Sequence, residues 1–580
     1  MSCIQAFFGE SCHQYIDHLK PQEGWQILSR DWVTLAFLSE ARIDIGEQSS
    51  LFSSPDGKCI GVFAGKIFGF RQLVNAFPAN LNHAQRMGLL FQRLYTEYDV
   101  NFPNALEGFF SVIMAIDGKL FAARDAIGER PLYVMSSFRE TMIANQMSAL
   151  VHHPKCVRNM HPGAISDFLS TGFMPFARTP VGQISKIFPG STFEVNDTGV
   201  ETYTYHELPN HDHSIPEQQC IKQIRNALTH AVTNRLEPGK KTALLLSGGL
   251  DSSLVGALVG GENLVAAYSL TFGEHYRNEL EYSGLMARAL GIPARIITVT
   301  PLMIKQNFLK TATILDEPIG DPLTIPNIII AEEAAKEAQI VFNGEGGDPV
   351  FGGPKNLPIM AFEAYANGIQ EISREEIYLQ SYNKGHEHQK TILTADFLQE
   401  TIHHPTTAEL LAPYLYSTNM DSYLDRLMYL NLRLKGAAQI LPKVFKASSA
   451  AGLAVRSPLF DRRLVEQALA MPSPMKLKGA VEKFVLKKAV ADIVPESIIS
   501  RPKSGMLVPV HFWFRNELQS FASEVLLDSG ARTRYFVDRK AVSNLLQFKG
   551  SGVRPHYGQR IWLLLSLEFW MQAYGISDTF

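Results

Sequence analysis

The middle of the 580-residue chain carries short clusters of serine, glycine and acidic residues whose types suit a phosphorylated ligand. The first cluster, residues 244–253 (LLLSGGLDSS), begins within a strand-like apolar run over residues 242–246 and precedes a helix-like apolar run over residues 254–259. A glycine turn between strand and helix directs backbone N–H groups and the positive end of a helix toward an anion. We therefore expect this loop to bind phosphate through Leu246, Ser247, Gly248, Gly249, Ser252 and Ser253.

One acidic residue within this loop indicates which kind of phosphate ligand to expect. Asp251 would repel a phosphate unless a divalent cation lay between them. The G-x-x-x-x-G-K-[ST] spacing of a Walker A loop is absent, so the site is not that of a P-loop protein. The loop predicts a nucleotide bound with Mg²⁺. An ordinary strand–turn–helix connection with a serine-rich N-cap is the alternative.

Two further clusters supply carboxylates. Residues 315–322 (LDEPIGDP) form an acidic turn with two prolines, and residues 341–353 (VFNGEGGDPVFGG) read as a strand followed by a glycine-rich loop. Taken singly, the acids could cap helices and the glycines could form a plain loop. Together with Asp251, the carboxylate of Asp348 could hold Mg²⁺ on a pyrophosphate, with Gly344 and Gly346 beside the nucleotide.

The order of elements around these clusters predicts how they meet. A helix over 217–236, strands over 242–246, 264–271 and 294–299, and a helix over 280–290 alternate along the chain. Alternation of this kind is typical of a parallel, doubly wound α/β sheet, which binds ligands at the carboxyl ends of its strands. The C-terminal third reads as mainly helical.

The first 208 residues have a different pattern, with short strands over 58–62, 67–70, 109–116 and 120–123 and a helix over 85–98. Asp117–Gly118 is a hairpin signal between two of the strands. We expect an antiparallel, layered α+β domain here. Residues 208–216 (LPNHDHSIP) break the periodicity, so the predicted domains are residues 1–208 and 216–580.

The composition of the whole chain argues against several classes of function. The net charge of −3 gives no basic excess for nucleic acid. No apolar run reaches the roughly 18–20 residues that a membrane span requires, and the first residues lack a secretory signal pattern. The 5 cysteines have no C-x-x-C spacing and fit reduced thiols. These features predict a cytoplasmic enzyme with no nucleic-acid or membrane partner.

The N-terminal pattern resembles the glutaminase domain of asparagine synthetases. The resemblance lies in residues 105–110 (ALEGFF), 123–125 (ARD) and 128–133 (GERPLY). It implies an N-terminal-nucleophile (Ntn) hydrolase fold, an αββα sandwich whose chemistry needs a cysteine exposed after removal of methionine. Ser2 stands at that position and the cysteine is Cys3, while Ala64–Gly65–Lys66 replaces the family's Asn-Gly-Glu. We therefore expect a retained scaffold without glutaminase activity.

The three central clusters resemble the ATP-pyrophosphatase synthetase domain of the asparagine synthetase and β-lactam synthetase superfamily. Residues 455–461 (VRSPLFD), 482–489 (EKFVLKKA) and 501–505 (RPKSG) continue the resemblance, and Lys483 and Arg501 within them could be structural or face the phosphates. It implies ATP and Mg²⁺ as cofactors, adenylation of a substrate carboxylate, and displacement of AMP by an amine. It also implies that Lys503 stabilises the developing negative charge. Glu345 stands at a position where asparagine synthetases have Glu and β-lactam synthetases have Tyr. The resemblance implies that its carboxylate takes a proton from the amine.

The function expected from the sequence is an AMP-forming amide synthetase, with the amine coming from the substrate itself to close a lactam. An ammonia-dependent asparagine synthetase-like enzyme is the first alternative, and Glu345 favours it. A nucleotide-binding scaffold without activity is the second. The expected partner is a small, amino-acid-like carboxylate substrate, and the sequence leaves a homodimer open.

Overall fold

The chain forms two compact units in the computed structural model, which describes residues 2–9, 24–40, 43–137, 140–196, 198–209, 214–366, 372–382, 384–501, 505–549 and 556–576. The first unit comprises Met1–Arg158 and Phe176–Leu208, and the second comprises Asn159–Pro175 and Pro209–Phe580. Residues 159–175 thus pack with the second unit although they precede the last strands of the first. The expected functional domains, residues 1–208 and 216–580, remain a prediction.

The first unit is built on two six-stranded sheets whose described pairings are all antiparallel. One sheet has the order β10-β8-β9-β1-β3-β2 and the other the order β12-β11-β7-β6-β5-β4. The strands of the first are β1 (Cys3–Gly9), β2 (Trp25–Arg30), β3 (Val33–Leu38), β8 (Tyr133–Ser136), β9 (Glu140–Ala144) and β10 (Ile184–Lys186). Those of the second are β4 (Ser50–Ser53), β5 (Ile60–Ile67), β6 (Gly108–Ile116), β7 (Lys119–Arg124), β11 (Ser191–Asn196) and β12 (Gly199–Thr204).

Apolar side chains fill the space between and outside these sheets. Ile4, Leu35, Val62 and Ile113 belong to a core made by both sheets. A second core, which includes Phe91 and Phe110, lies between the β5–β6 face and helix α3 (His83–Tyr98). The remaining helical segments are α2 (Phe70–Val74), the 3₁₀ helix η2 (Asp99–Ala105) and α4 (Met147–Val151). This αββα layering confirms the expected Ntn-type fold.

Strand β5 differs from the expectation of two short strands over 58–62 and 67–70. A single strand runs from Ile60 to Ile67, and Phe70 begins α2. Gly65 explains the continuity, because its φ of +134° suits glycine and an added Cβ would lie 2.1 Å from the Phe109 carbonyl oxygen. The glycine therefore permits close strand pairing where the sequence pattern suggested an interruption.

The second unit contains a parallel sheet of five strands in the order β15-β14-β13-β16-β17. These are β13 (Thr242–Leu245), β14 (Leu264–Thr271), β15 (Ala294–Thr298), β16 (Ile340–Phe342) and β17 (Ala454–Arg456). The chain moves outward from β13 to β15 and then returns to the other side of β13. The order reverses between β13 and β16, and open α/β sheets bind ligands at such a reversal. The doubly wound sheet is confirmed.

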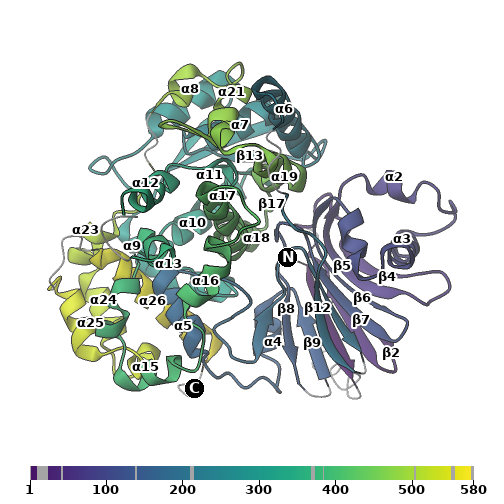
Figure 1. Cartoon of the computed structure of the whole chain (residues 1–580), viewed down its shortest axis with the longest axis horizontal. Coiled ribbons are helices and arrows are strands. Elements are labelled where there is room, and N and C mark those ends of the chain that lie inside the picture. The colour runs from purple at the N-terminus through teal and green to yellow at the C-terminus, as the bar shows by residue number, and fades with distance from the viewer. Residues whose placement is uncertain are drawn as a thin grey trace. The chain divides into compact units, whose positions relative to one another are not determined.

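Helices surround this sheet and make up the rest of the second unit. In Figure 1, α6, α7, α8 and α21 (Phe484–Ala489) gather around β13. The helices before β17 are α5 (Pro162–Thr171), α6 (Glu217–Thr233), α7 (Leu250–Val259), α8 (Leu280–Leu290), α9 (Pro301–Ile314), α10 (Thr324–Ala334), α11 (Gly347–Phe351), α12 (Asn356–Ala366), α13 (Arg374–Ser381), α14 (Gln389–Ile392), α15 (Ala395–Thr401), α16 (Thr407–Leu415), α17 (Tyr423–Leu430), the π-helix η5 (Asn431–Ile440) and α18 (Leu441–Ala450).

Most of the described residues after β17 lie in helices, as expected. Its helices are α19 (Arg462–Ala470), α20 (Ser473–Lys476), α21 (Phe484–Ala489), α22 (Glu496–Ile499), α23 (Val510–Arg515), α24 (Gln519–Leu526), α25 (Arg539–Leu546) and α26 (Tyr557–Tyr574), with short strands β18 (Leu477–Lys478) and β19 (Val481–Glu482) between them. Among the described residues, no helix combines the length and the apolar character that a membrane crossing would need.

Candidate active site

The serine-glycine loop leaves the carboxyl end of β13 and enters α7, as the sequence predicted. Gly249 is the N-cap of α7, and no side chain caps the helix there. Inside the loop, the Ser247 amide donates to Ser252 Oγ at 3.2 Å, and the Gly249 amide donates to Ser247 Oγ at 3.3 Å. The buried Ser253 hydroxyl has no hydrogen-bond partner among the described residues. The loop therefore offers a helix N-terminus and serine hydroxyls to an anion.

The glycine-rich loop after β16 packs directly on this first loop. A Cβ at Gly344 would lie 2.3 Å from the Ser252 amide nitrogen, and one at Gly347 would lie 2.2 Å from Asp251 Oδ1. Gly346 has a φ of +113° and precedes α11. The absence of side chains at these positions is what lets the two loops meet at the reversal of the sheet.

Lys483 joins the two predicted metal ligands. Its Nζ lies 2.6 Å from Asp251 Oδ2 and 2.6 Å from Asp348 Oδ1. The lysine is only 2% exposed and has a φ of 55° at the N-cap of α21. Burial disfavours its charge, but the carboxylates of Asp251 and Asp348 outweigh burial and raise the pKa of Lys483 above its ordinary value. An ammonium thus stays charged between two acids that would otherwise repel each other.

The residues present fit a magnesium ion bound together with a phosphorylated substrate. Asp251 and Asp348 are oxygen donors of the kind that Mg²⁺ prefers, and both reach the same ammonium group. In the described part of the chain, no group of three or more His, Cys, Asp or Glu side chains could hold a metal ion. A Mg²⁺ ion here would therefore take its remaining ligands from substrate phosphates and water. The assignment of Asp251 and Asp348 as metal ligands stays a prediction.

The acidic turn of residues 315–322 is anchored by lysines on helix α18. Lys446 Nζ lies 2.6 Å from Asp316 Oδ2, and Lys443 Nζ lies 2.8 Å from Asp321 Oδ2. Burial would raise the pKa of Asp321, but the positive charges of Lys443 and Lys384 hold it below its usual range. Asp316 is therefore a buried structural acid, while Asp321 remains partly exposed.

Glu345 lies beside the same lysine. Its Oε1 is 3.8 Å from Lys443 Nζ, and its amide donates to Asn343 Oδ1 at 3.0 Å. Its side chain keeps 38% of its surface exposed, so it can meet a substrate. Burial lowers the pKa of Lys443, but Asp321 and Glu345 together raise it to about 12. Glu345 therefore faces the charged ammonium of Lys443.

The predicted catalytic Lys503 lies outside the described residues. Two positions earlier, the Arg501 guanidinium donates to Glu279 and lies 4.3 Å from the centre of the Tyr282 ring. Glu279 and Tyr282 are also the residues that a Cβ at Gly248 would meet, together with Ser283. Arg501 thus makes structural contacts with the residues that pack against Gly248 of the serine-glycine loop. The role of Lys503 stays a prediction.

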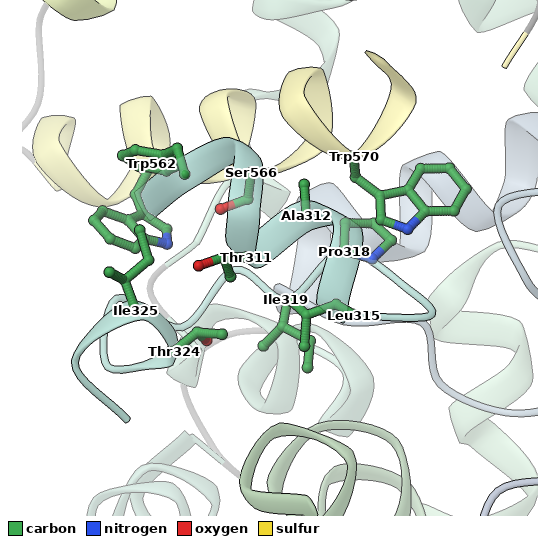
Figure 2. Close-up of a pocket in the computed structure, with 11 residues that line it drawn as sticks. Thr311, Ala312, Leu315, Pro318, Ile319, Thr324, Ile325, Trp562, Ser566 and Trp570 are labelled. Atoms are coloured by element: carbon green, nitrogen blue, oxygen red, sulfur yellow. The ribbon is translucent and has the colours of Figure 1, made fainter. Parts of the chain in front are cut away.

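A small cavity of about 20 Å³ lies behind the acidic turn, lined by Leu315, Pro318 and Ile319 on one side. Figure 2 shows Thr311 from α9 facing Trp562 and Ser566 from α26 across it. Thr311 Oγ1 and Trp562 Nε1 are buried and have no hydrogen-bond partner within the described segments. The volume suits about one water molecule rather than a substrate.

The structure therefore brings together most of the residues expected from the sequence and adds several lysines. The serine-glycine loop, Gly344, Gly346, Asp251, Asp348 and Glu345 gather at the reversal of the sheet. Lys443 and Lys446 were not anticipated. Their signal was available, since two lysines three residues apart lie on one face of a helix.

The fold and this site define a class: an Ntn-type amidotransferase unit joined to a nucleotide-dependent ligase unit with a parallel sheet. Comparison with protein-family models supports this class. The family model described as asparagine synthase matches residues 223–572, and the glutamine amidotransferase domain model matches residues 10–206. The chain belongs to the asparagine synthase family. It is an ATP-using carbon–nitrogen ligase that forms amides and converts ATP to AMP.

Individual relatives are distant but extend over nearly the whole chain. Asparagine synthetase [glutamine-hydrolyzing] 1 of Bacillus subtilis (strain 168) is 24% identical over 561 residues, covering 91% of this chain and 88% of that protein. A putative asparagine synthetase [glutamine-hydrolyzing] of Mycobacterium bovis is 23% identical, covering 82% and 78%. Among solved structures, the NH3-dependent NAD synthetase of Campylobacter jejuni matches 38% of this chain and 95% of that one, with 18% identity and a TM-score of 0.20.

Proposed function

We propose that this ligase adenylates a substrate carboxylate with ATP and Mg²⁺ and then forms an amide, a lactam within the same substrate, without hydrolysing glutamine. The observation that carries the proposal is the meeting of Asp251, Asp348 and Lys483 beside the serine-glycine loop. When bound, Mg²⁺ would neutralise the pyrophosphate leaving group. Asp251 and Asp348 would hold it, and Lys483 would keep these carboxylates oriented toward the phosphates.

The chain's own groups suit the two steps in turn. The N-terminus of α7 and the serine hydroxyls would bind and orient the phosphates, so that the carboxylate attacks the α-phosphate in line. Glu345 would then take the proton of the attacking amine, since its carboxylate is partly exposed and lies 3.8 Å from Lys443 Nζ. Lys503 would stabilise the negative charge that develops during these steps.

A changed glutaminase pocket supports the part of the proposal that concerns glutamine. Ser2 is fully buried, its hydroxyl donates to Asp44, and it accepts the Glu40 amide at 3.2 Å. The hydroxyl is thus engaged in structural hydrogen bonds. Ala64 and Lys66 stand where the resembling family has the Asn and Glu that bind glutamine. With no glutamine-derived ammonia, an amine on the substrate is the simplest nitrogen source.

The second candidate is an ammonia-dependent enzyme that converts aspartate to asparagine. The observation that favours it is the carboxylate at position 345, which matches asparagine synthetases rather than β-lactam synthetases. Both candidates share the adenylation half-reaction and differ only in the amine.

Exchange of radiolabelled pyrophosphate into ATP, measured with a panel of carboxylic acids, tests the shared half-reaction. We expect exchange with at least one amino-acid-like carboxylate and a cyclised product when that acid carries a free amine. Exchange with aspartate and ammonia-dependent formation of asparagine would contradict the lactam proposal. No exchange together with no ATP binding would instead favour the nucleotide-binding scaffold.

Asp251→Ala should abolish this exchange, because the variant loses a metal ligand and the main partner of Lys483. The matched control is Asp396→Ala, which removes an exposed acid at the start of α15 and should leave exchange unchanged. Unchanged exchange in Asp251→Ala would show that the metal binds elsewhere.

A further inference from the structure

Asn343 is the first residue after β16, at the carboxyl end of the parallel sheet and two positions before Glu345. It is only 3% exposed. Its backbone amide donates to the Arg456 carbonyl at 3.1 Å, one step beyond the pairing of Phe342 with Arg456 in β16 and β17. The backbone of Asn343 is therefore held by the sheet, whereas the residues after it form the glycine-rich loop.

Both arms of the buried Asn343 side chain are engaged. Its Oδ1 accepts the Glu345 amide at 3.0 Å, and its Nδ2 donates to Ser457 Oγ at 2.9 Å. Because the Glu345 amide can only donate, the oxygen must face it and the nitrogen must face Ser457. An amide side chain that accepts the backbone N–H two residues ahead closes an Asx turn, which sets the direction of the chain. Asn343 therefore links the backbone of Glu345 to Ser457.

Ser457 is a fixed anchor for this link. It is 3% exposed and directly follows β17, and its carbonyl accepts the Phe460 amide at 3.1 Å, which closes the 3₁₀ helix η6 (Pro458–Phe460). The same helix also packs on the residue that follows Glu345. A Cβ at Gly346 would lie 3.1 Å from Phe460 Cδ2. The segment after β17 therefore fixes the loop both before and after Glu345.

The side chain of Glu345 depends on this backbone support. Its carboxylate lies 3.8 Å from Lys443 Nζ, which is longer than a hydrogen bond, and the side chain keeps 38% of its surface exposed. This loose contact leaves the direction of the carboxylate to the backbone at position 345. A general base must lie within hydrogen-bond reach of the proton it removes, and a displacement on the order of 1 Å can lower a rate by about 100-fold.

The phosphate-binding part of the loop is held by other contacts. A Cβ at Gly344 would meet the Ser252 amide nitrogen, and one at Gly347 would meet the Asp251 carboxylate. Neither contact involves the side chain of Asn343. Loss of that side chain should therefore displace Glu345 more than it displaces the bound phosphates.

We propose that Asn343, anchored by Ser457, is a positioning residue that orients Glu345 for the amide-forming step. The inference rests on the proposed function, in which Glu345 removes the proton of the attacking amine. In that step the amine nitrogen bonds to the acyl carbon, the bond from this carbon to the phosphate oxygen of AMP breaks, and the proton passes to Glu345. Asn343 acts through the backbone of Glu345 rather than on the substrate, so its loss slows the second half-reaction selectively.

Two kinds of nucleophile separate the half-reactions in the full chain. Each acid that supports pyrophosphate exchange is assayed for the amide formed with its own amine or with ammonium chloride, and for the hydroxamate formed with hydroxylamine. Hydroxylamine is uncharged and strongly nucleophilic near neutral pH, so it attacks the acyl carbon without a general base, AMP leaves, and the proton goes to water. Asn343→Ala should slow amide formation by about 10- to 100-fold, but pyrophosphate exchange and hydroxamate formation by less than about threefold.

Further variants identify the contact responsible. Ser457→Ala should lower amide formation several-fold, and the double variant Asn343→Ala/Ser457→Ala should lower it no further than Asn343→Ala alone, because both residues act through one contact. If Asn343→Ala fails to fold, Ser457→Ala carries the same test. The matched control is Asn145→Ala in the first unit, which should leave the ratio of amide to hydroxamate unchanged. Asn145 is 1% exposed and also uses both arms, accepting the Ile4 amide at 3.0 Å and donating to the Ser2 carbonyl at 2.9 Å.

Hydrogen exchange measured without any substrate tests the contact itself. The Glu345 amide should exchange its hydrogen about 10-fold faster in Asn343→Ala than in the unmodified chain, because it loses its acceptor. The same amide should exchange at the unmodified rate in Asn145→Ala.

An equal fall in amide formation, hydroxamate formation and pyrophosphate exchange would overturn the positioning role, because Asn343 would then support the whole loop. Unchanged amide formation in Asn343→Ala, or unchanged hydrogen exchange of the Glu345 amide, would overturn it as well. The failure of the proposed function would look different. In that case the unmodified chain would show no pyrophosphate exchange with any acid, and the role of Asn343 would fall together with the role of Glu345.

Discussion

Lys483 shows how one side chain can hold together a site whose other members lie far away in the sequence. It lies 232 positions from Asp251, yet its ammonium contacts both Asp251 and Asp348. Two carboxylates this close would repel each other, and the lysine charge offsets that repulsion. A bound pyrophosphate would bring further negative charge, which the same ammonium and a divalent cation could share. The lysine therefore belongs to the phosphate-binding machinery in the proposed reaction.

Lys483→Met tests this role at the level of one residue. The variant keeps most of the buried volume but removes the charge between Asp251 and Asp348, so we expect pyrophosphate exchange to fall on the order of 100-fold. Lys487→Met is the matched control, because Lys487 lies in α21, which Lys483 caps, and pairs with Glu482 at 3.2 Å instead of with Asp251 or Asp348. Equal exchange rates in the two variants would contradict the assignment.

Asp44 in the first unit gives a pH-dependent prediction. Burial, together with the negative charge of Glu47, raises the pKa of Asp44 from 3.8 to about 6, although the Ser2 hydroxyl opposes the shift. The folded state therefore holds this proton more tightly than the unfolded state. Stability should fall as pH rises from about 4 to about 6, by up to about 3 kcal/mol, and stay at the lower level above that range.

Asp44→Asn should remove that loss, because the amide stays neutral and can still accept the Ser2 hydroxyl. Hydrogen exchange of β1 and β3 amides, compared at each pH between the variant and the unmodified chain, reports the stability of this unit. We expect protection in the variant to exceed that of the unmodified chain at pH 7 and to match it near pH 4. A constant difference across this range would mean that Asp44 is not the titrating group.

At the scale of elements, the parallel sheet determines where the sequence clusters meet. Repeated strand–helix alternation was enough to predict that the loops after β13 and β16 share one edge, and the structure confirms it. The contacts of Lys483 were not predictable in the same way. The motif of residues 482–489 marked it as either structural or phosphate-facing, but its left-handed backbone, unusual for a residue other than glycine, has no signal in the sequence.

Close packing of the two loops leads to a prediction about glycine. Gly347→Ala would place a Cβ 2.2 Å from Asp251 Oδ1 and force that carboxylate to move. A displacement on the order of 1 Å should lower pyrophosphate exchange by about 100-fold. Gly284→Ala in helix α8 meets only Arg288 at 3.4 Å, so it should keep full exchange and stabilise the chain by up to about 1 kcal/mol. Full activity of Gly347→Ala would show that the loops separate during turnover.

At the scale of the whole molecule, the chain keeps an amidotransferase fold. Its residues at the expected nucleophile and glutamine-binding positions differ from those of the family that it resembles. The αββα layers and the Asp117–Gly118 hairpin are intact, with φ angles of 51° and 76° at those two residues. Asp125 still orders its turn by accepting the amides of Gly128 at 2.7 Å and Arg130 at 2.9 Å. The fold therefore gives no reason for lost activity, and the expectation rests on Ser2 and on Ala64 and Lys66.

This contrast yields a prediction for the complete chain. Incubated with glutamine, ATP and an acid that supports pyrophosphate exchange, it should release no glutamate, because both the nucleophile and the glutamine-binding residues have changed. Ser2→Cys should not restore release, since a thiol alone leaves Ala64 and Lys66 in the pocket. The B. subtilis relative, named as glutamine-hydrolyzing, is the positive control. Release of glutamate in proportion to AMP would contradict the prediction and would identify glutamine as the nitrogen source. AMP formed without glutamate would mean that the amine comes from ammonia or from the substrate itself.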